Sequence, residues 1–288
     1  MRLKGWEIEH TLNMERLRRV WRYLREKYGV LSEKKYTTIA GTLVFFLIMS
    51  IVPLTFWLTL VVGKLPVSFE SVLRLSVFNS VEKVFAFVQR EAENATASVS
   101  VLLLITTLYS ATNLFYQMRR SGELIYGYSH KKQGIRMRLG AVALMFIVML
   151  LVVAFAVILA LGTVLFSWFL PKNLQTIADY ILLIALSFVL VLLLNSYICP
   201  YKRPLKAFVG GTVITVVAWV GAVVGFTAYL KISNMAKLYG ALSVIIVFLL
   251  WLYALMICFI AGVIFNSEKI ETERKEKNRT RRKKPKPA

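Results

Sequence analysis

Six stretches of the chain contain no Asp, Glu, Lys or Arg, and each is long enough to cross a lipid bilayer. They run over Tyr36–Gly63, Asn94–Met118, Leu139–Pro171, Tyr180–Tyr201, Ala207–Leu230 and Leu238–Ser267. The shortest has 22 residues, which as an α-helix spans roughly 33 Å, against a hydrocarbon core of about 30 Å. The sequence therefore predicts an all-α, polytopic membrane protein with six transmembrane helices.

The distribution of charge predicts the orientation of these helices. The formal net charge is +21, and the charges lie outside the six stretches. The segments before span 1, between spans 2 and 3, between spans 4 and 5, and after span 6 hold 29 of the Lys and Arg residues, against 7 in the other three connections. Because positive segments are retained in the cytoplasm, both termini are expected to be cytoplasmic.

The polar segments complete the predicted organisation. Residues 1–35 are expected to form a cytoplasmic amphipathic N-terminal helix, residues 36–267 the six-span membrane domain, and residues 268–288 a basic, disordered cytoplasmic tail. Residues 64–93, the longest outer connection, repeat apolar residues at helical spacing. One or two amphipathic helices are predicted there, and either a structural cap or a lid over a cavity fits the pattern.

Span 2 has the most polar interior of the six. Four polar residues recur at spacings of four, three and four, with two tyrosines nearby: Thr106, Ser110, Asn113 and Gln117, with Tyr109 and Tyr116. Polar groups in hydrocarbon need hydrogen-bond partners, so this polar stripe is expected to face other helices or water. It is interpreted either as a contact between helices or as a substrate-facing wall.

Two features of other spans suggest roles in hinge motion and helix packing. Pro53 in span 1 frees the carbonyl of Met49 and predicts a kink that could act as a hinge. Span 5 carries small residues, including a GxxxG pair, at Gly210, Gly221 and Gly225. Such residues let another helix approach closely, whether it belongs to the same chain or to a second subunit.

Cationic residues gather at the predicted cytoplasmic ends of the spans. They form a candidate rim for a phosphate-bearing lipid headgroup, which consists of Arg119, Arg120, Lys131, Lys132, Arg136, Arg138, Lys202, Arg203 and Lys206. The predicted headgroup contacts within it are Arg119, Arg120, Lys202, Arg203 and Lys206. The same charges are also required by topology alone. Membrane lipids, chiefly anionic ones, are therefore the expected partners, and the oligomeric state is not predicted.

Little in the chain predicts catalysis. The two cysteines, Cys199 and Cys258, lie at or within spans, and the two histidines, His10 and His130, lie in different cytoplasmic segments. No metal site, cofactor or enzymatic activity is expected from so dispersed a set of ligands. The basic tail lacks the interleaved aromatic residues of stacking platforms, so no nucleic-acid partner is expected either.

The second half of the chain resembles the YihY/BrkB family of bacterial inner-membrane proteins. The likeness rests on Tyr197–Arg203 leading into Gly210-Gly211, on Tyr239–Leu242, and on Trp251-Leu252-Tyr253 followed by Gly262 and Asn266; Leu108–Leu114 and Ile125-Tyr126-Gly127 extend it. It implies six helices and a place in the bacterial inner membrane. Two positions depart from the family pattern, because Ile264 replaces a common acidic residue and Glu123 a frequent Asn.

Two functions are compatible with these patterns. The family was once labelled ribonuclease BN, but the chain shows no cluster of metal ligands for that chemistry. The first hypothesis is a transporter or flippase-like protein for a lipid or amphipathic solute, based on the polar stripe and the basic rim. The alternative is a membrane scaffold or envelope-integrity factor without cargo, in which the polar stripe is sealed between helices.

Overall fold

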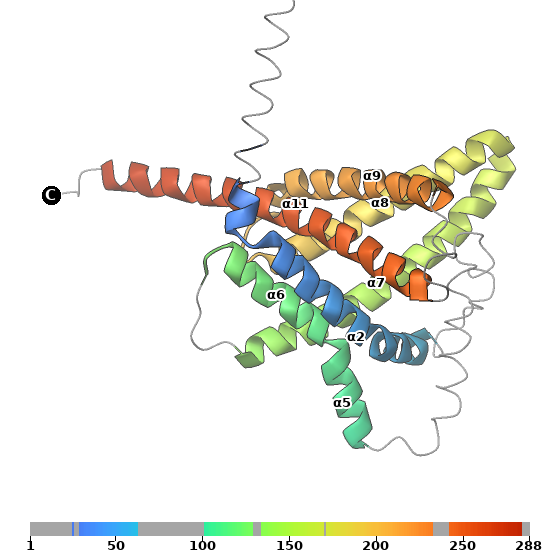
Figure 1. Cartoon of the computed structure of the whole chain (residues 1–288), viewed down its shortest axis with the longest axis horizontal. Coiled ribbons are helices and arrows are strands. Elements are labelled where there is room, and N and C mark those ends of the chain that lie inside the picture. The colour runs from blue at the N-terminus through green and yellow to red at the C-terminus, as the bar shows by residue number, and fades with distance from the viewer. Residues whose placement is uncertain are drawn as a thin grey trace, which may run out of the picture.

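A computed structural model describes residues 25, 29–62, 101–128, 134–169, 171–232 and 242–283. Within these residues the chain is helical, and no strand occurs. The elements are α2 (Tyr36–Val62), α5 (Val101–Ala111), α6 (Asn113–Ile125), α7 (Gly134–Phe169), α8 (Lys172–Ile198), the short 3-10 helix η2 (Leu205–Phe208), α9 (Val209–Ile232) and α11 (Leu242–Lys283) (Figure 1). The all-α prediction agrees with this architecture.

Four helical segments in the described part of the chain are long and apolar enough to cross a membrane. They cover Gly134–Phe169, Leu174–Ile198, Leu205–Tyr229 and Ile246–Glu276, and Tyr36–Ile51 is a shorter apolar helix. Their outward faces carry many exposed large apolar side chains, such as Leu161, Trp168 and Val224. These surfaces need a lipid environment, whereas the count of six spans stays a prediction.

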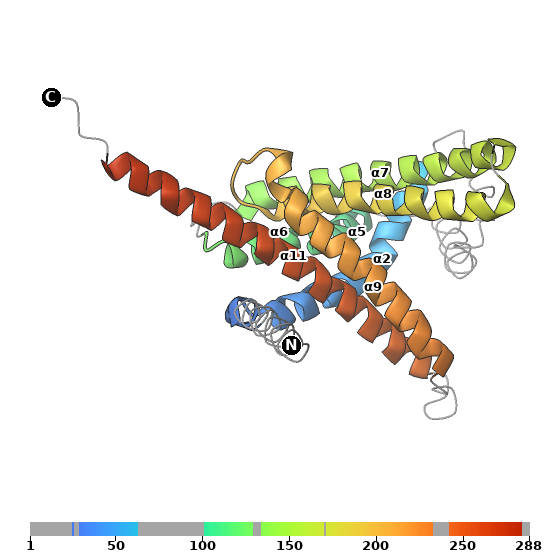
Figure 2. The ribbon, with the colours of Figure 1, turned by 90° about the horizontal axis from the view of Figure 1, so that it is seen from above.

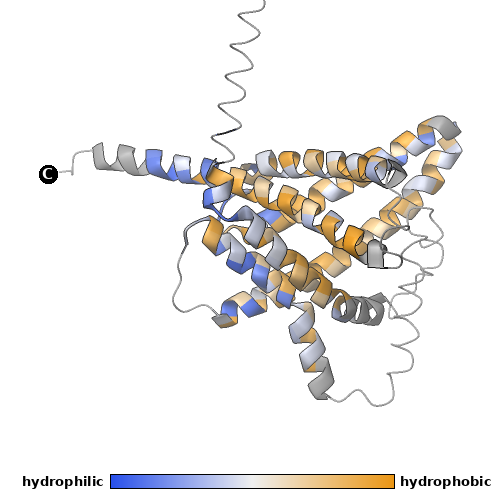
Figure 3. Ribbon diagram, in the orientation of Figure 1, coloured by the Kyte–Doolittle hydropathy of each residue, from blue (hydrophilic) through white to orange (hydrophobic). Residues whose placement is uncertain are grey.

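The long helices form two adjacent pairs. Helix α7 lies beside α8, and α9 beside α11, while α8 and α9 connect the pairs (Figure 2). The pairs converge near the end of α8 and diverge toward the opposite end of the bundle (Figure 2). Helix α6 packs against α2, α7 and α8 at the convergent end. Hydrophilic residues gather at this end, in α6, the first turns of α7 and the last part of α11 (Figure 3); we call it the basic end.

A close crossing of α9 and α11 forms the tightest contact at the basic end. A Cβ atom at Gly211 would overlap the carbonyl oxygen of Gly262, and one at Gly262 would overlap the backbone of Gly211 and the hydroxyl of Thr215. Only glycine at both positions allows the two backbones to touch. Gly210, predicted to mediate packing, lies beside the Phe265 ring, 3.1 Å from where its Cβ would be.

Buried amides stabilise this crossing. Asn266 is fully buried; its Oδ1 accepts a hydrogen bond from the Gly211 N–H at 2.8 Å, and its Nδ2 donates to Asn195 Oδ1 at 3.4 Å and to the Phe208 carbonyl at 3.3 Å. Asn195 Nδ2 in turn donates to Thr212 Oγ1 at 3.2 Å. The network connects α8, α9 and α11, and it satisfies an N–H in the first turn of α9.

The C-terminal tail differs from its prediction. Residues 268–283 were expected to be disordered, but α11 continues without a break to Lys283. Ile270 is fully buried, Lys34 pairs with Glu271 at 3.1 Å, and Arg203 pairs with Glu273 at 3.4 Å. Interleaved acidic and basic residues favour a helix, and no Gly or Pro interrupts the sequence before Pro285. The tail is therefore helical up to Lys283.

Other predicted segments can be placed only in part. Pro53 lies inside α2, and the ribbon of this helix bends in its second half (Figure 1); motion at this bend stays a prediction. The predicted amphipathic segment 64–93 lies outside the described residues. Of the predicted N-terminal helix, only residue 25 and residues 29–35 are described, and 29–33 are helical.

Candidate functional site

The polar stripe lies across a break in the predicted second span. Asn94–Met118 was predicted as one continuous helix, but α5 ends at Ala111 and α6 begins at Asn113, and the two change direction at Thr112 (Figure 1). The Thr112 hydroxyl donates to the carbonyls of Leu108 and Tyr109, both at 3.0 Å. Such back-bonding by Thr bends helices, which accounts for the change of direction.

A side chain of helix α2 also contacts the backbone at the bend between α5 and α6. The hydroxyl of Ser50, which is fully buried, donates to the Ser110 carbonyl at 3.1 Å. Hydrogen bonds from Thr112 N to the Leu108 carbonyl and from Tyr116 N to the Thr112 carbonyl continue across the bend. The bend is therefore a fixed feature of the backbone, held by side chains from two helices.

Arg138 of α7 lies against the polar stripe. Its Nη1 donates to Asn113 Oδ1 at 3.2 Å, and its Nη2 donates to the Tyr109 hydroxyl at 2.8 Å. The guanidinium carbon lies 4.1 Å from the centroid of the Tyr109 ring and 4.0 Å from that of Tyr116. These hydrogen bonds and cation–π contacts hold the guanidinium in one orientation. We call Arg138, Tyr109, Asn113 and Tyr116 the Arg138 site.

The structure brings together only part of the predicted stripe. Tyr109, Asn113 and Tyr116 meet at Arg138, whereas Ser110 contributes its backbone carbonyl to the contact with α2. Thr106 is exposed and Gln117 is half-buried. The sequence placed Arg138 in the basic rim but did not predict its contact with the stripe, because the charge-free stretch begins at Leu139 whereas the helix begins at Gly134.

Arg119, predicted as part of the rim, contacts the end of α8. Its guanidinium donates to the carbonyls of Tyr197 and Cys199. A cation at a helix C-terminus compensates both the unpaired carbonyls and the negative end of the dipole. One turn further along α6, a Cβ atom at Gly122 would overlap the Ile198 carbonyl. Gly122 and Arg119 thus fix the crossing of α6 and α8.

The other rim residues differ in their surroundings. Arg203 forms the ion pair with Glu273, whereas Arg120, Lys202 and Lys206 are exposed at the basic end. Lys34 adds a cation that sequence reasoning had not selected. Its ammonium donates to the Ile125 carbonyl, Ser267 Oγ and Glu271, and so connects α6 with α11.

Tyrosines surround the basic residues at the end of α6. The helix ends where Gly127 adopts a φ of +60°, a conformation that favours glycine. The ring of Tyr201 packs edge-on against Tyr126 and Tyr128, and the Arg274 guanidinium lies 4.2 Å from its centroid. Burial raises the pKa of Tyr126 above its ordinary value.

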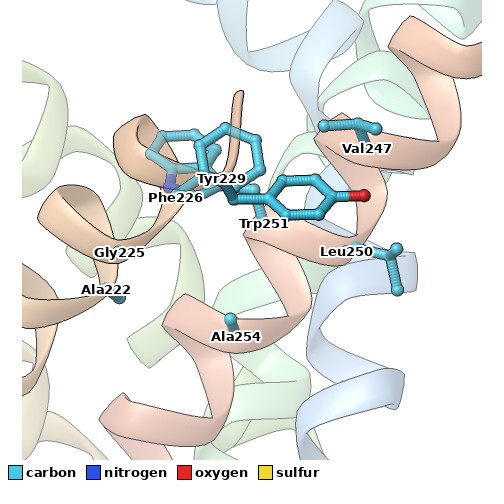
Figure 4. A pocket seen from close by; sticks show the side chains of 8 residues that line it. All are labelled: Ala222, Gly225, Phe226, Tyr229, Val247, Leu250, Trp251 and Ala254. Carbon is cyan, nitrogen blue, oxygen red and sulfur yellow. The ribbon is translucent and has the colours of Figure 1, made fainter. Parts of the chain in front are cut away.

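The predicted glycine pair of span 5 does not form a close contact in the described part of the chain. A Cβ atom at Gly221 or Gly225 would meet nothing within 4 Å. Instead, Gly225 borders an apolar pocket of about 330 Å³ between α9 and α11, with aromatic side chains from both helices (Figure 4). The lining residues are Ala222, Gly225, Phe226, Tyr229, Val247, Leu250, Trp251 and Ala254.

Metal-ligating side chains are dispersed in the structure. Among the described residues, no three His, Cys, Asp or Glu side chains come together as a metal site would require. The Arg138 site offers a guanidinium, an amide and two phenol groups. These groups bind anions and polar headgroups.

Comparison with known sequences identifies the family. The model of the family described as "Virulence factor BrkB" matches residues 28–287. The chain belongs to the BrkB family. Proteins called UPF0761 membrane protein from Coxiella burnetii strains Dugway 5J108-111, RSA 331 and CbuG_Q212 are each 26% identical over 247 residues, covering 79% of this chain and 86% of theirs. No solved structure gives a significant match.

Membership of the BrkB family confirms the resemblance drawn from the sequence motifs. The structure gives several of these motif residues a physical role. Gly211 and Gly262 allow α9 and α11 to touch, and Asn266 stabilises that crossing. Gly127 ends α6 in a left-handed conformation. Ile264, at the position where the resemblance led us to expect an acidic residue, is buried in the apolar core of this BrkB-family protein.

Proposed function

We propose that this BrkB-family protein moves a lipid or an amphipathic solute across the bacterial inner membrane, with the Arg138 site receiving the polar headgroup. The observation that carries the proposal is a guanidinium held against a polar helix face at the start of a membrane-length helix. In this proposal the basic end faces the cytoplasm, as the charge distribution predicts.

The geometry of Arg138 supports recognition of an anionic headgroup. A guanidinium has five N–H groups, and the hydrogen bonds to Asn113 and Tyr109 use one on each of the two terminal nitrogens. The remaining N–H groups are available to phosphate oxygens, for which the planar fork is well suited. Because two rings already fix its position, Arg138 loses little conformational entropy on binding.

The surroundings fit a cargo with an apolar part. Tyr109 is 57% exposed and Leu139, which follows Arg138, is 65% exposed. An acyl chain could lie against such apolar surfaces while its headgroup contacts the polar stripe. The bend at Thr112 gives α5 and α6 different directions, so the residues of the stripe lie on two helices that are inclined to one another.

A second candidate function is the scaffold without cargo. The same contacts support this function, because Arg138 already provides hydrogen-bond donors to Asn113 and Tyr109 within the chain. In that case the polar stripe would serve only to join α6 to α7. The two functions differ in whether lipid movement depends on the guanidinium.

Lipid movement in proteoliposomes tests the proposal. The full chain is reconstituted with fluorescent phosphatidylglycerol, and transfer between leaflets is followed by dithionite quenching. Wild-type protein is expected to accelerate transfer over protein-free vesicles, and Arg138→Gln is expected to lower the rate about tenfold, the effect of losing hydrogen bonds to a charged group.

Lys269→Gln is the matched control, because it removes one exposed cation from α11, away from the polar stripe. It should transfer lipid at the wild-type rate. Equal transfer by wild-type and protein-free vesicles would overturn transport of this lipid. Equal transfer by Arg138→Gln and wild type would show that the Arg138 site is not on the path.

A further inference from the structure

A basic cavity lies at the basic end, between α6, α7 and α8. It has a volume of about 330 Å³, and its lining combines two arginines with two hydroxyl groups: Arg119, Arg136, Met137, Gly140, Ser196 and Tyr197. This volume falls within the range of small-molecule sites, roughly 300–1,000 Å³. None of the lining residues is acidic.

This cavity is separate from the Arg138 site. Arg136 and Arg138 are two residues apart in α7, which places their side chains about 200° apart around the helix axis. Arg138 contacts Tyr109, Asn113 and Tyr116, whereas Arg136 lies with residues of α6 and of the end of α8. The two arginines therefore serve opposite faces of α7.

The polar groups of the cavity are suited to an acceptor-rich ligand. Arg119 is already oriented by the Tyr197 and Cys199 carbonyls through a single nitrogen, Nη1, which leaves its other nitrogens available. The Tyr197 hydroxyl oxygen is buried and has no hydrogen-bond partner among the described residues. A buried hydroxyl without a partner is unfavourable, and an anionic oxygen beside it would satisfy it.

Exposed apolar residues that neighbour the lining residues in α7 favour an amphiphile over a free ion. Ile135 and Leu139, the residues that precede Arg136 and Gly140 in α7, are 80% and 65% exposed. Large apolar side chains so close to a guanidinium provide a surface for an acyl chain next to a site for its headgroup. A water-soluble phosphate would gain nothing from this surface.

We infer that the cavity between α6, α7 and α8 binds the phosphate group of an anionic lipid headgroup, through Arg119, Arg136, Ser196 and Tyr197, with an acyl chain along Ile135 and Leu139. The inference deepens the proposed function, on which it rests for the choice of a lipid, by naming the class of headgroup and a docking site beside the transport path. A Cβ atom at Gly140 would lie 4.0 Å from the Tyr197 ring, an ordinary contact, so only a larger side chain at this position would fill the cavity.

Equilibrium binding of dioctanoyl phosphatidylglycerol to the purified full chain tests the inference. Arg136→Gln is expected to weaken binding about tenfold, because one charged partner of the phosphate is lost. Gly140→Leu should weaken binding as strongly by filling the cavity, whereas Gly140→Ala makes only an ordinary contact and should bind as wild type does. Lys269→Gln provides the control for the loss of one positive charge.

Inorganic phosphate distinguishes the source of the anion. It should fail to compete with the lipid at equal concentration; equal competition would overturn the assignment to a lipid headgroup. Wild-type affinity in Arg136→Gln, or an equal loss in Lys269→Gln, would overturn the site itself. Binding is measured without lipid movement, so its failure is distinguishable from a failure of transport at Arg138.

Discussion

The two ends of the α9–α11 pair show opposite uses of small residues. At the basic end, Gly211 and Gly262 bring the two backbones into contact, and Asn266 completes the hydrogen bonds there. Toward the other end, Gly221 and Gly225 meet nothing within 4 Å, and Gly225 borders an apolar pocket. Small residues therefore form a close crossing at one end of this helix pair and border a pocket at the other.

The two ends of the helix pair also differ in how tightly their side chains are constrained. The crossing near Gly262 is fully buried and its polar groups are satisfied by one another. The pocket near Gly225 is lined by aromatic and aliphatic side chains without such constraints. Substitutions at the two ends should therefore differ in size and in sign.

The largest effect is expected for Gly262→Val. The new side chain would overlap the Gly211 backbone and the Thr215 hydroxyl, and neither helix can move without breaking the Asn266 network. The free energy of unfolding should fall by more than about 3 kcal/mol. Thermal unfolding in detergent measures it, and a melting temperature equal to that of wild type would contradict the close crossing.

A smaller loss is expected for Asn266→Ala. The substitution removes the partner of the Gly211 N–H and of Asn195 Oδ1 in a buried place, while the Phe208 carbonyl keeps its hydrogen bond from the Thr212 hydroxyl. An unsatisfied buried polar group costs roughly 1–3 kcal/mol, so a loss of about 2 kcal/mol is expected. The same unfolding experiment applies, with Asn113→Ala as a comparison at a half-buried amide. Equal losses at the two amides would mean that burial at the crossing adds nothing.

The smallest effect, of opposite sign, is expected for Gly225→Ala. The added methyl group enters open space, and alanine is a better helix former than glycine. Stability should rise by about 0.5–1 kcal/mol. Destabilisation would indicate that a second copy of the chain or another helix approaches α9 here. Chemical crosslinking of the variant and of wild type would then identify that partner.

Much of the helical architecture could be predicted from the sequence, because it depends on long charge-free stretches. Helices α7, α8, α9 and α11 contain four of the predicted spans, and hydrocarbon allows no other regular structure for a single stretch. The helix bounds were less predictable. Charged residues such as Arg136 and Arg138 continue α7 beyond its apolar part, and α11 continues far past Ser267.

The candidate site was harder to predict, because it depends on contacts between distant segments. The stripe of Tyr109, Asn113 and Tyr116 was visible as a pattern, but its partner Arg138 was predicted only as one of several cations in the basic rim. The break at Thr112 has no proline or glycine to signal it. Arg119 was predicted to bind a lipid headgroup, and its contacts with carbonyls at the end of α8 are ones that no spacing in the sequence indicates.

Water access to Asn113 tests most directly whether the polar stripe is a path for a headgroup. Asn113→Cys is treated in native membranes with a membrane-impermeant maleimide, and wild type, which keeps Cys199 and Cys258, gives the background. The account predicts labelling of the variant above that background, and protection when an anionic short-chain lipid is added. A variant that stays unlabelled while folded would show that the stripe is sealed between helices, and would contradict the transport function.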